Sequence, residues 1–285
     1  MSSLLNNIQN EYWLFYKTPV VRQLAFALLS PNIIQKIPQE LEVFYPFQLH
    51  DSQKWQNFYT QYKPRLEFLD QNPNELQNFL NKLKSTRLGL RFEMLIWFWL
   101  LDSNYHPYEV LAHGLQIIQG PKTVGELDFV VKNTENNQIE HWEVALKYYL
   151  GESDLTLKNW YGLNRSDTLF KKMYHFSQKQ FQFSHVLDLE INEKFAVIKG
   201  QLYLPLYQNS LEIPTWINLD RRLGNWGTCF PKHAKKHHRL SRHEWLCPHN
   251  NASSSHNKWW TDGLYFNSDS SHYYMYRSPS LPYLI

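Results

Sequence analysis

Cysteine is scarce in this sequence, and only Cys229 and Cys247 occur among its 285 residues. Two cysteines cannot form the disulfide framework that organises many small secreted domains, so the fold must rest on a buried apolar core. A large excess of charge is lacking as well, because 29 Lys and Arg stand against 26 Asp and Glu. The resulting net charge of +3 permits a nucleic-acid partner but does not demand one.

Long apolar runs are also absent. The longest, residues 94–101, is far shorter than the roughly 20 residues that a helix needs to cross a bilayer. Residues 1–13 are polar and rich in Asn, and they do not show the basic start and apolar stretch of a signal peptide. These absences predict a cytoplasmic protein that does not associate with the membrane.

Apolar and aromatic residues are plentiful, at 43% and 16% of the chain, which favours globular packing over disorder. The length suits one large or two small domains. We divide the chain into a mainly helical N-terminal region at residues 1–84, a core at residues 85–205, and an aromatic-rich C-terminal extension at residues 206–285. We expect this extension to pack on the core.

Helical spacing of apolar residues predicts helices at residues 11–29, 52–62 and 73–83. Prolines, including Pro19 and Pro64, are expected to interrupt this region. Residues 88–101 are apolar on nearly every face, which is typical of a buried helix. Glu93 breaks that pattern, and because an unpaired buried carboxylate is costly, it should face a cation, a donor or a wet cleft.

The middle of the chain predicts strands. A short strand is expected at residues 115–118, followed by a break and a hairpin of strands at residues 124–131 and 139–150. Ser166 is expected to cap a helix reaching about residue 181, and residues 195–204 form another strand ended by Pro205. The order of elements predicts an α/β (α+β) fold with a central mixed sheet flanked by helices.

The predicted hairpin contains candidate residues for metal binding and for charge stabilisation. Side chains alternate across a strand, so Glu126 and Asp128 share one face, and Glu143 and Lys147 share a face of the partner strand. Magnesium prefers oxygen ligands, which Asp128 and Glu143 can supply, and Lys147 can stabilise negative charge on a phosphate. The alternative is an ordinary solvated face with a surface ion pair.

The hairpin resembles the PD-(D/E)XK nuclease superfamily in two segments, GELDF at residues 125–129 and HWEVALK at residues 141–147. More narrowly, the chain is similar to a bacterial domain family of uncharacterised function grouped with that superfamily. The resemblance covers residues 88–204 and implies a restriction-endonuclease-like core. It also implies metal-binding roles for Glu93, Asp128 and Glu143.

The lysine departs from the superfamily pattern. Members usually place it two residues after the second acid, where this chain has Ala145, and Lys147 lies roughly 7 Å farther along the strand. One alternative is that Lys171 or Lys172, on the following helix, has taken over the role. Another is a degenerate site that binds nucleic acid without cutting it.

The resemblance further implies that the helix after Ser166 flanks the site. Its candidates for phosphate contacts are Arg165, Lys171, Lys172, His175 and Gln178. For each of them, an ordinary solvated helix face is the alternative. A second basic stretch, residues 232–242, is flanked by Trp226 and Trp245 and is similar to a phosphate-binding strip with stacking side chains.

Together these features predict a nuclease that depends on Mg²⁺ or Mn²⁺ and hydrolyses DNA or RNA. Asp128 and Glu143 are the expected metal ligands, Glu93 assists through a water, and Lys147 orients the nucleophile, with Glu126 as a reserve ligand. The alternatives are a catalytically degenerate nucleic-acid-binding module and a protein-interaction module. The sequence leaves the oligomeric state open.

Overall fold

The computed structural model describes residues 11–207, 211–247, 260–267 and 269–279. Its α-helices are α1 (Pro19–Leu29), α2 (Ser52–Gln71), α3 (Asn74–Leu80), α4 (Leu88–Leu101) and α5 (Leu169–Gln178). Its longer strands are β1 (Tyr108–Gln119), β2 (Lys122–Asn133), β3 (Gln138–Gly151) and β7 (Glu193–Pro205). Its shorter strands are β4 (Trp160–Tyr161), β5 (His185–Val186), β6 (Leu189–Glu190), β8 (Gly224–Gly227), β9 (His238–Arg239), β10 (Gly263–Asn267) and β11 (His272–Tyr276).

The centre of the molecule is a mixed sheet of nine strands. Eight strands follow the order β1-β2-β3-β7-β8-β11-β10-β9, and β4 pairs with β3. The β3, β7, β8 and β11 pairings are parallel, whereas β1, β2 and β3 form antiparallel pairs. The predicted α/β (α+β) fold with a mixed sheet flanked by helices is confirmed.

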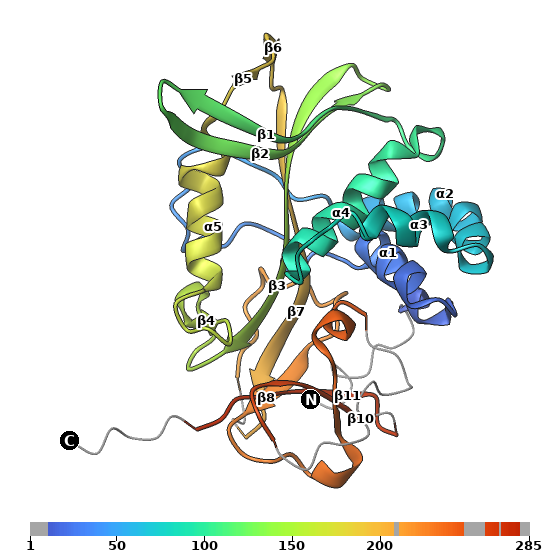
Figure 1. The fold of residues 1–285 in the computed structure, drawn as a ribbon. Coiled ribbons are helices and arrows are strands. Elements are labelled where there is room, and N and C mark those ends of the chain that lie inside the picture. Colours follow the sequence, from blue (N-terminus) through green and yellow to red (C-terminus); the bar gives the residue numbers. More distant parts are fainter. Residues whose placement is uncertain (1–10, 208–210, 248–259, 268, 280–285) are drawn as a thin grey trace.

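Both faces of β3 are covered. Trp142, Val144 and Leu146 belong to the large apolar cluster that includes residues of α1, α2 and α4. Ala145 and Tyr149 point the other way and join the cluster that contains the buried residues of α5. Figure 1 shows the arrangement, with α5 on one side of β3 and the four N-terminal helices on the other. Alternation along one strand therefore determines which residues face α5.

The N-terminal helices differ in their limits from the sequence prediction. Residues 11–29 do not form one helix, because the 3₁₀ helix η2 (Tyr12–Phe15) ends before α1 begins at Pro19. Proline fits the first turn of a helix, where its missing N–H removes no hydrogen bond. In contrast, α2 continues through Pro64 to Gln71, so the expected interruption there was wrong. Buried Tyr62, Leu66 and Leu69 hold this helix on the core despite the proline.

The start of α5 also differs. Thr168, rather than Ser166, caps the helix and accepts a hydrogen bond from the Lys171 backbone N–H at 3.1 Å. Ser166 instead donates from its hydroxyl to Asn164 Oδ1 at 3.0 Å. The helix therefore begins two residues later than the cap at Ser166 predicts.

The C-terminal residues extend the same sheet. The edge of β7 pairs with β8, and β11, β10 and β9 follow outward from it. One apolar cluster contains residues from all three predicted regions, including Leu24, Trp142 and Tyr273. The division of the chain at residues 84 and 205 stays a prediction. Among the helices in the described ranges, none combines the length and apolar character needed to pass through a bilayer.

Candidate active site

The candidate site lies where β2 and β3 part. Their backbone pairing runs from Asn133 and Gln138 as far as Phe129 and Trp142. At the next position, side-chain carboxylates replace the backbone carbonyls as hydrogen-bond acceptors. The Val144 N–H donates to Asp128 Oδ2 at 2.8 Å, and the Asp128 N–H lies 3.4 Å from Glu143 Oε1. Beyond this point β2 continues beside β1. Both carboxylates are thus fixed between the separating strands.

Glu143 is held from both sides. Its Oε1 accepts from His141 Nε2 at 2.8 Å, and its Oε2 accepts from Gln180 Nε2 at 2.5 Å. His141 is fully buried, and this burial lowers its pKa to about 3. The imidazole is therefore neutral, and it donates its single proton from Nε2 when Glu143 is ionised. His141 and Gln180 orient Glu143 without neutralising it.

The surroundings of the two carboxylates contain too little positive charge to stabilise both in their ionised form. Burial raises the pKa of Asp128, and the neighbouring Glu143 raises it further. Burial also raises the pKa of Glu143 to about 8, against the opposing effect of Lys172. Buried acids that repel one another in this way are stabilised in their ionised form by a cation. The donor set and its electrostatics therefore fit a divalent metal ion.

This fit involves a pair of acids rather than a larger cluster. Within the described ranges, no three Asp, Glu, His or Cys side chains are gathered closely enough to hold a metal ion together. Magnesium commonly takes one or two protein carboxylates and completes its shell with water and substrate phosphate. Asp128 and Glu143 are the donors that match this pattern.

The two lysines near the carboxylates differ in their contacts. Lys147 Nζ lies 2.8 Å from Asp167 Oδ2, in an ion pair with the loop before α5. Lys172, on α5, takes part in none of the ion pairs found among the described residues, and its Nζ lies 3.9 Å from the centroid of the Phe176 ring. Burial lowers the pKa of Lys172, while Glu143 and Asp128 act in the opposite direction. Lys172 is thus the ammonium that faces the carboxylates.

Glu93 approaches from α4. Its Oε1 lies 2.8 Å from His113 Nε2, and the His113 ring stacks on Trp97 with the ring centroids 4.0 Å apart. A carboxylate in an apolar helix is expected to face a polar partner or a cleft. Glu93 does both, because it contacts His113 and also lines the cleft.

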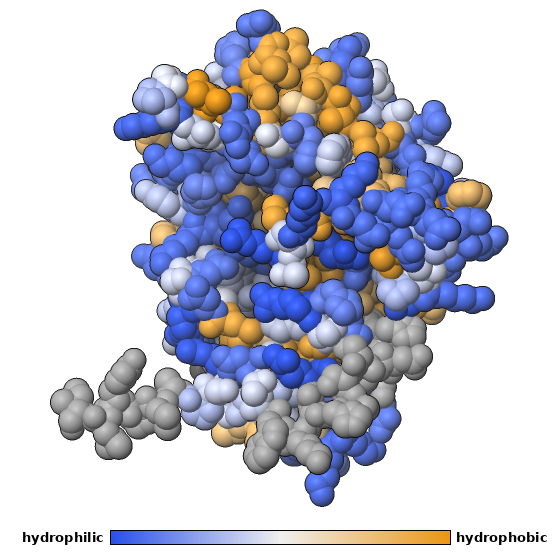
Figure 2. Space-filling view, in the orientation of Figure 1, coloured by the Kyte–Doolittle hydropathy of each residue, from blue (hydrophilic) through white to orange (hydrophobic). Residues whose placement is uncertain are grey.

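The cleft around these residues measures about 670 Å³. It is bounded by the start of α4, by β3, by the loop before α5, and by Lys172 and Gln180. Its acidic lining residues are Glu93, Asp128, Glu143 and Asp167, and its basic ones are Arg87, Lys147, Lys172 and Arg242. Figure 2 shows hydrophilic residues across the middle of this face, between α5 and α4, and a hydrophobic area toward the β1 and β2 end.

The C-terminal residues also reach the cleft. Arg242 and Trp245 belong to the 3₁₀ helix η7 (Arg242–Trp245), and both line the cleft. The Arg242 guanidinium lies 4.4 Å from the centroid of the Trp245 ring. Tyr148 holds this segment to β3, because its hydroxyl donates to the Trp245 carbonyl at 2.8 Å. The basic stretch at residues 232–242 is therefore divided, and only its last residue lines the carboxylate cleft.

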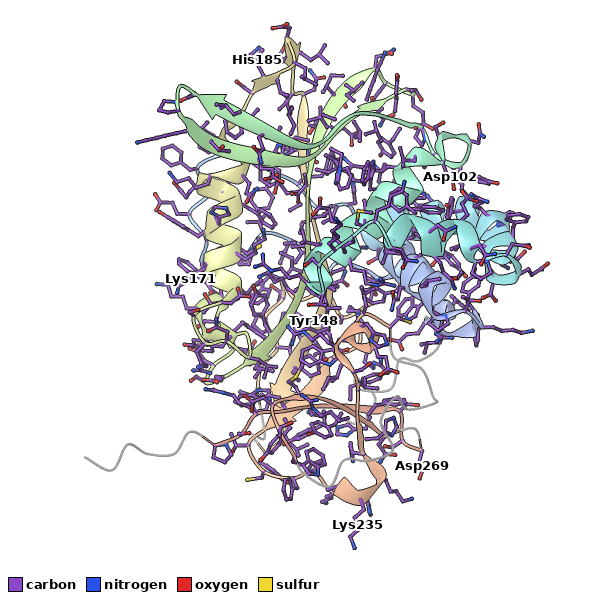
Figure 3. The ribbon with its side chains drawn as sticks, viewed as in Figure 1. Asp102, Tyr148, Lys171, His185, Lys235 and Asp269 are labelled. Atoms are coloured by element: carbon purple, nitrogen blue, oxygen red, sulfur yellow. The ribbon has the colours of Figure 1, made fainter. Side chains whose placement is uncertain are left out.

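Most of the predicted phosphate contacts lie elsewhere. Arg165 pairs with Glu152, and its guanidinium lies 3.7 Å from the centroid of the Tyr161 ring. Lys171 points away from the sheet (Figure 3) and donates to the Ser166 carbonyl at 2.8 Å. The lining of the cleft includes Lys172, but not Arg165, Lys171, His175, Gln178 or the reserve ligand Glu126.

Residues at the site that were not predicted from the sequence include His141, Gln180 and Arg242. His141 precedes Glu143 by two positions on the same strand, a spacing that places both side chains on one face. Gln180 follows Lys172 by about two helical turns, although a break after α5 makes that spacing a weak signal. Arg242 was noted only as part of a basic stretch, because the chain path that brings it to β3 cannot be inferred from composition.

Comparisons with known proteins give one match. A search of curated proteins found none, and a search of solved structures found none either. The model of a family described as a domain of unknown function, DUF1853, matches residues 22–272. This match includes the cleft, the whole of β3 and α5, and most of the C-terminal strands. The chain belongs to the DUF1853 family.

Proposed function

We propose that this protein is a metal-dependent nuclease that hydrolyses DNA or RNA through a site of the PD-(D/E)XK type. The observation that best supports the proposal is the pair of half-buried Asp128 and buried Glu143, which lie where β2 and β3 separate and are faced by Lys172. The basic residues Arg87 and Arg242 on the same cleft support a polyanionic substrate.

Asp128 and Glu143 are the proposed ligands of Mg²⁺ or Mn²⁺. To Glu93, which lines the same cleft, we assign a contact with a water of that site. A divalent cation bound there supplies neutralisation of the phosphate charge and makes a coordinated water more acidic. His141 and Gln180 keep the Glu143 carboxylate in a fixed orientation. Such partners of a ligand usually matter for both affinity and rate.

We assign the lysine role to Lys172 rather than to Lys147. Lys172 acts on the pKa of both carboxylates, whereas Lys147 is engaged by Asp167. An ammonium in a partly buried cleft stabilises the negative charge that develops on the phosphate during hydrolysis. Lys147 then has a positioning role, because its ion pair ties the loop before α5 to β3.

The alternative is a nucleic-acid-binding module that has lost the chemistry. It is supported by the hydrogen bonds that already occupy both Glu143 oxygens and by the raised pKa of Glu143, which favours its protonated form. Binding without cleavage is expected in that case, with an affinity that falls as the salt concentration rises.

The test is metal-dependent cleavage of single- and double-stranded DNA and RNA by the wild type and by Asp128→Ala and Glu143→Ala. Glu126→Ala is the matched control, because Glu126 is an exposed acid on the same strand as Asp128. Melting curves establish that each variant is folded. Loss of cleavage in the first two variants alone supports the nuclease, whereas binding without cleavage by the wild type supports the module.

A further inference from the structure

The C-terminal part of the molecule contains a second hollow of about 640 Å³. It is formed by the two residues directly after β7, the residues before β8, the loop at residues 231–237, and the turn between β10 and β11. None of its lining residues lines the carboxylate cleft. Figure 3 labels Asp269 at this end of the molecule, away from Tyr148 in the wall of the cleft. We call this hollow the C-terminal pocket.

Basic side chains dominate the C-terminal pocket. They are Arg222, Lys232, His233, Lys236, His237 and His272. The one carboxylate among its described lining residues is Asp269, whose Oδ2 already lies 2.9 Å from Lys236 Nζ. The pocket therefore has the electrostatic character of an anion site.

Arg222 brings a buried positive charge to the pocket. Only 5% of its surface is exposed, and its guanidinium lies 3.8 Å from the centroid of the Tyr273 ring. Its ion-pair partner is Glu11, at 3.0 Å, but Glu11 also pairs with Arg221 at 2.7 Å. One carboxylate thus serves two guanidinium groups. The Arg222 Nε–H has no hydrogen-bond partner among the described residues, so both a charge and a donor remain uncompensated.

Two histidines form a chain of contacts with an acceptor at each end. His237 Nδ1 lies 3.2 Å from the His233 carbonyl, His237 Nε2 lies 3.0 Å from His272 Nδ1, and His272 Nε2 lies 3.1 Å from Asn225 Oδ1. Two neutral imidazoles have only two N–H groups for these three contacts. One added proton satisfies all of them and gives the pair a positive charge.

Without a ligand, the surroundings of His237 and His272 disfavour the protonation of this pair. Burial lowers the pKa of His272 to about 4, with further effects from His237 and Arg222. Burial likewise lowers the pKa of His237, and His238 and His233 act in the same direction. A bound anion reverses this balance by stabilising the protonated pair.

We propose that the C-terminal pocket binds the phosphate group of a phosphomonoester. The lining cations Arg222, Lys232 and Lys236, set against the lining acid Asp269, leave two positive charges with the histidines neutral. Arg221 and Glu11, which form an ion pair outside the lining, add no net charge. Two charges match a phosphomonoester dianion better than a monoanionic diester. Tyr207, 63% exposed on the rim, offers a flat surface to the rest of the ligand.

Two sources can present this group: a free mononucleotide and the 5′-terminal phosphate of a nucleic acid. The test is calorimetric titration of the whole protein in EDTA, so that no divalent cation bridges phosphate to the carboxylate cleft. The probes are inorganic phosphate, AMP, and one short oligonucleotide with either a 5′-phosphate or a 5′-hydroxyl. The proposal does not require the cleft to be a nuclease, so Asp128→Ala should bind these probes as the wild type does.

Lys232→Glu and Lys235→Glu form a matched pair, because both lysines are exposed in the same loop but only Lys232 lines the pocket. We expect the wild type to bind inorganic phosphate and Lys232→Glu to bind it about tenfold more weakly, with Lys235→Glu within about twofold of the wild type. His272→Gln should weaken binding in the same direction. Tighter binding of the 5′-phosphorylated oligonucleotide than of AMP assigns the terminus, and the reverse order assigns the mononucleotide.

Three results overturn the proposal. The first is the absence of phosphate binding by the folded wild type. The second is an equal loss in Lys232→Glu and Lys235→Glu, which indicates general surface charge rather than a pocket. A 5′-hydroxyl oligonucleotide that binds as tightly as the phosphorylated one likewise excludes a monoester site.

Discussion

The carboxylate cleft and the C-terminal pocket are similar in volume, about 670 and 640 Å³, but their charges are arranged differently. The lining of the cleft contains four acidic and four basic residues, and its acids include half-buried Asp128 and buried Glu143. The C-terminal pocket has one exposed acid and a buried arginine. The cleft can therefore hold phosphate only with help from a cation, whereas the pocket is able to attract phosphate directly.

The largest effect is expected from a mutation that removes the proposed function of the cleft and leaves that of the C-terminal pocket unchanged. Asp128→Ala combined with Glu143→Ala should reduce metal-dependent cleavage by at least about 10³-fold, because both proposed ligands are removed. The same double variant should bind inorganic phosphate in EDTA as the wild type does. Cleavage rates and calorimetric titrations check the two halves of the prediction. A double variant that still cuts at the wild-type rate would place the chemistry outside the cleft.

The next effect concerns the two adjacent lysines of α5. Lys172→Met should lower the cleavage rate by about 10²-fold, because it removes the charge that faces the carboxylates. Lys171→Met should stay within about twofold, since Lys171 is exposed and bonded to the Ser166 carbonyl. Single-turnover rates with saturating metal measure both. A larger loss of cleavage rate in Lys147→Met than in Lys172→Met would indicate that Lys147, on β3, has the role assigned to Lys172.

A third effect follows from the raised pKa of Glu143. With that pKa at about 8, the metal-free site at pH 6.5 holds Glu143 protonated, and a metal ion must displace the proton. Affinity for Mn²⁺ should therefore increase with pH, by about tenfold between pH 6.5 and 7.5, and level off above pH 8. Calorimetric titration at the two pH values measures this, and Glu143→Gln should show a flatter dependence. Equal affinities in the wild type would mean that Glu143 is not a ligand.

The smallest effect concerns the rim of the cleft. Arg242→Ala should weaken binding of a nucleic-acid substrate by about threefold to fivefold and reduce the salt dependence by about one counterion. Arg165→Ala is the control, because Arg165 is paired with Glu152 and does not line the cleft. Fluorescence anisotropy at several salt concentrations distinguishes them. Equal losses in the two variants would remove the special role of Arg242.

Local patterns were enough to predict much of the framework. Residues 88–101 are uniformly apolar and form α4 with the expected limits. The alternation around Asp128 and Glu143 identified the hairpin and placed both acids on the strands that carry them. These features depend on residues close together in sequence, which is where periodicity is informative.

Long-range arrangement was not predictable in the same way. Lys147 and Lys172 are both compatible with the sequence pattern, and only the packing of α5 against β3 brings Lys172 to the acids. Pro64 is a helix breaker by local rules, but buried contacts keep α2 intact around it. The C-terminal strands are short, so their pairing beyond β7 depends on contacts that no local pattern encodes.

The side-chain hydrogen bonds at the parting of β2 and β3 make two backbone amides sensitive to the state of the cleft. The Val144 N–H depends on Asp128 Oδ2, and the Asp128 N–H lies near Glu143 Oε1. A cation that draws these carboxylates toward itself must lengthen or share those bonds. The amide resonances and hydrogen-exchange rates of Asp128 and Val144 should therefore report cation binding in the cleft in the absence of any substrate.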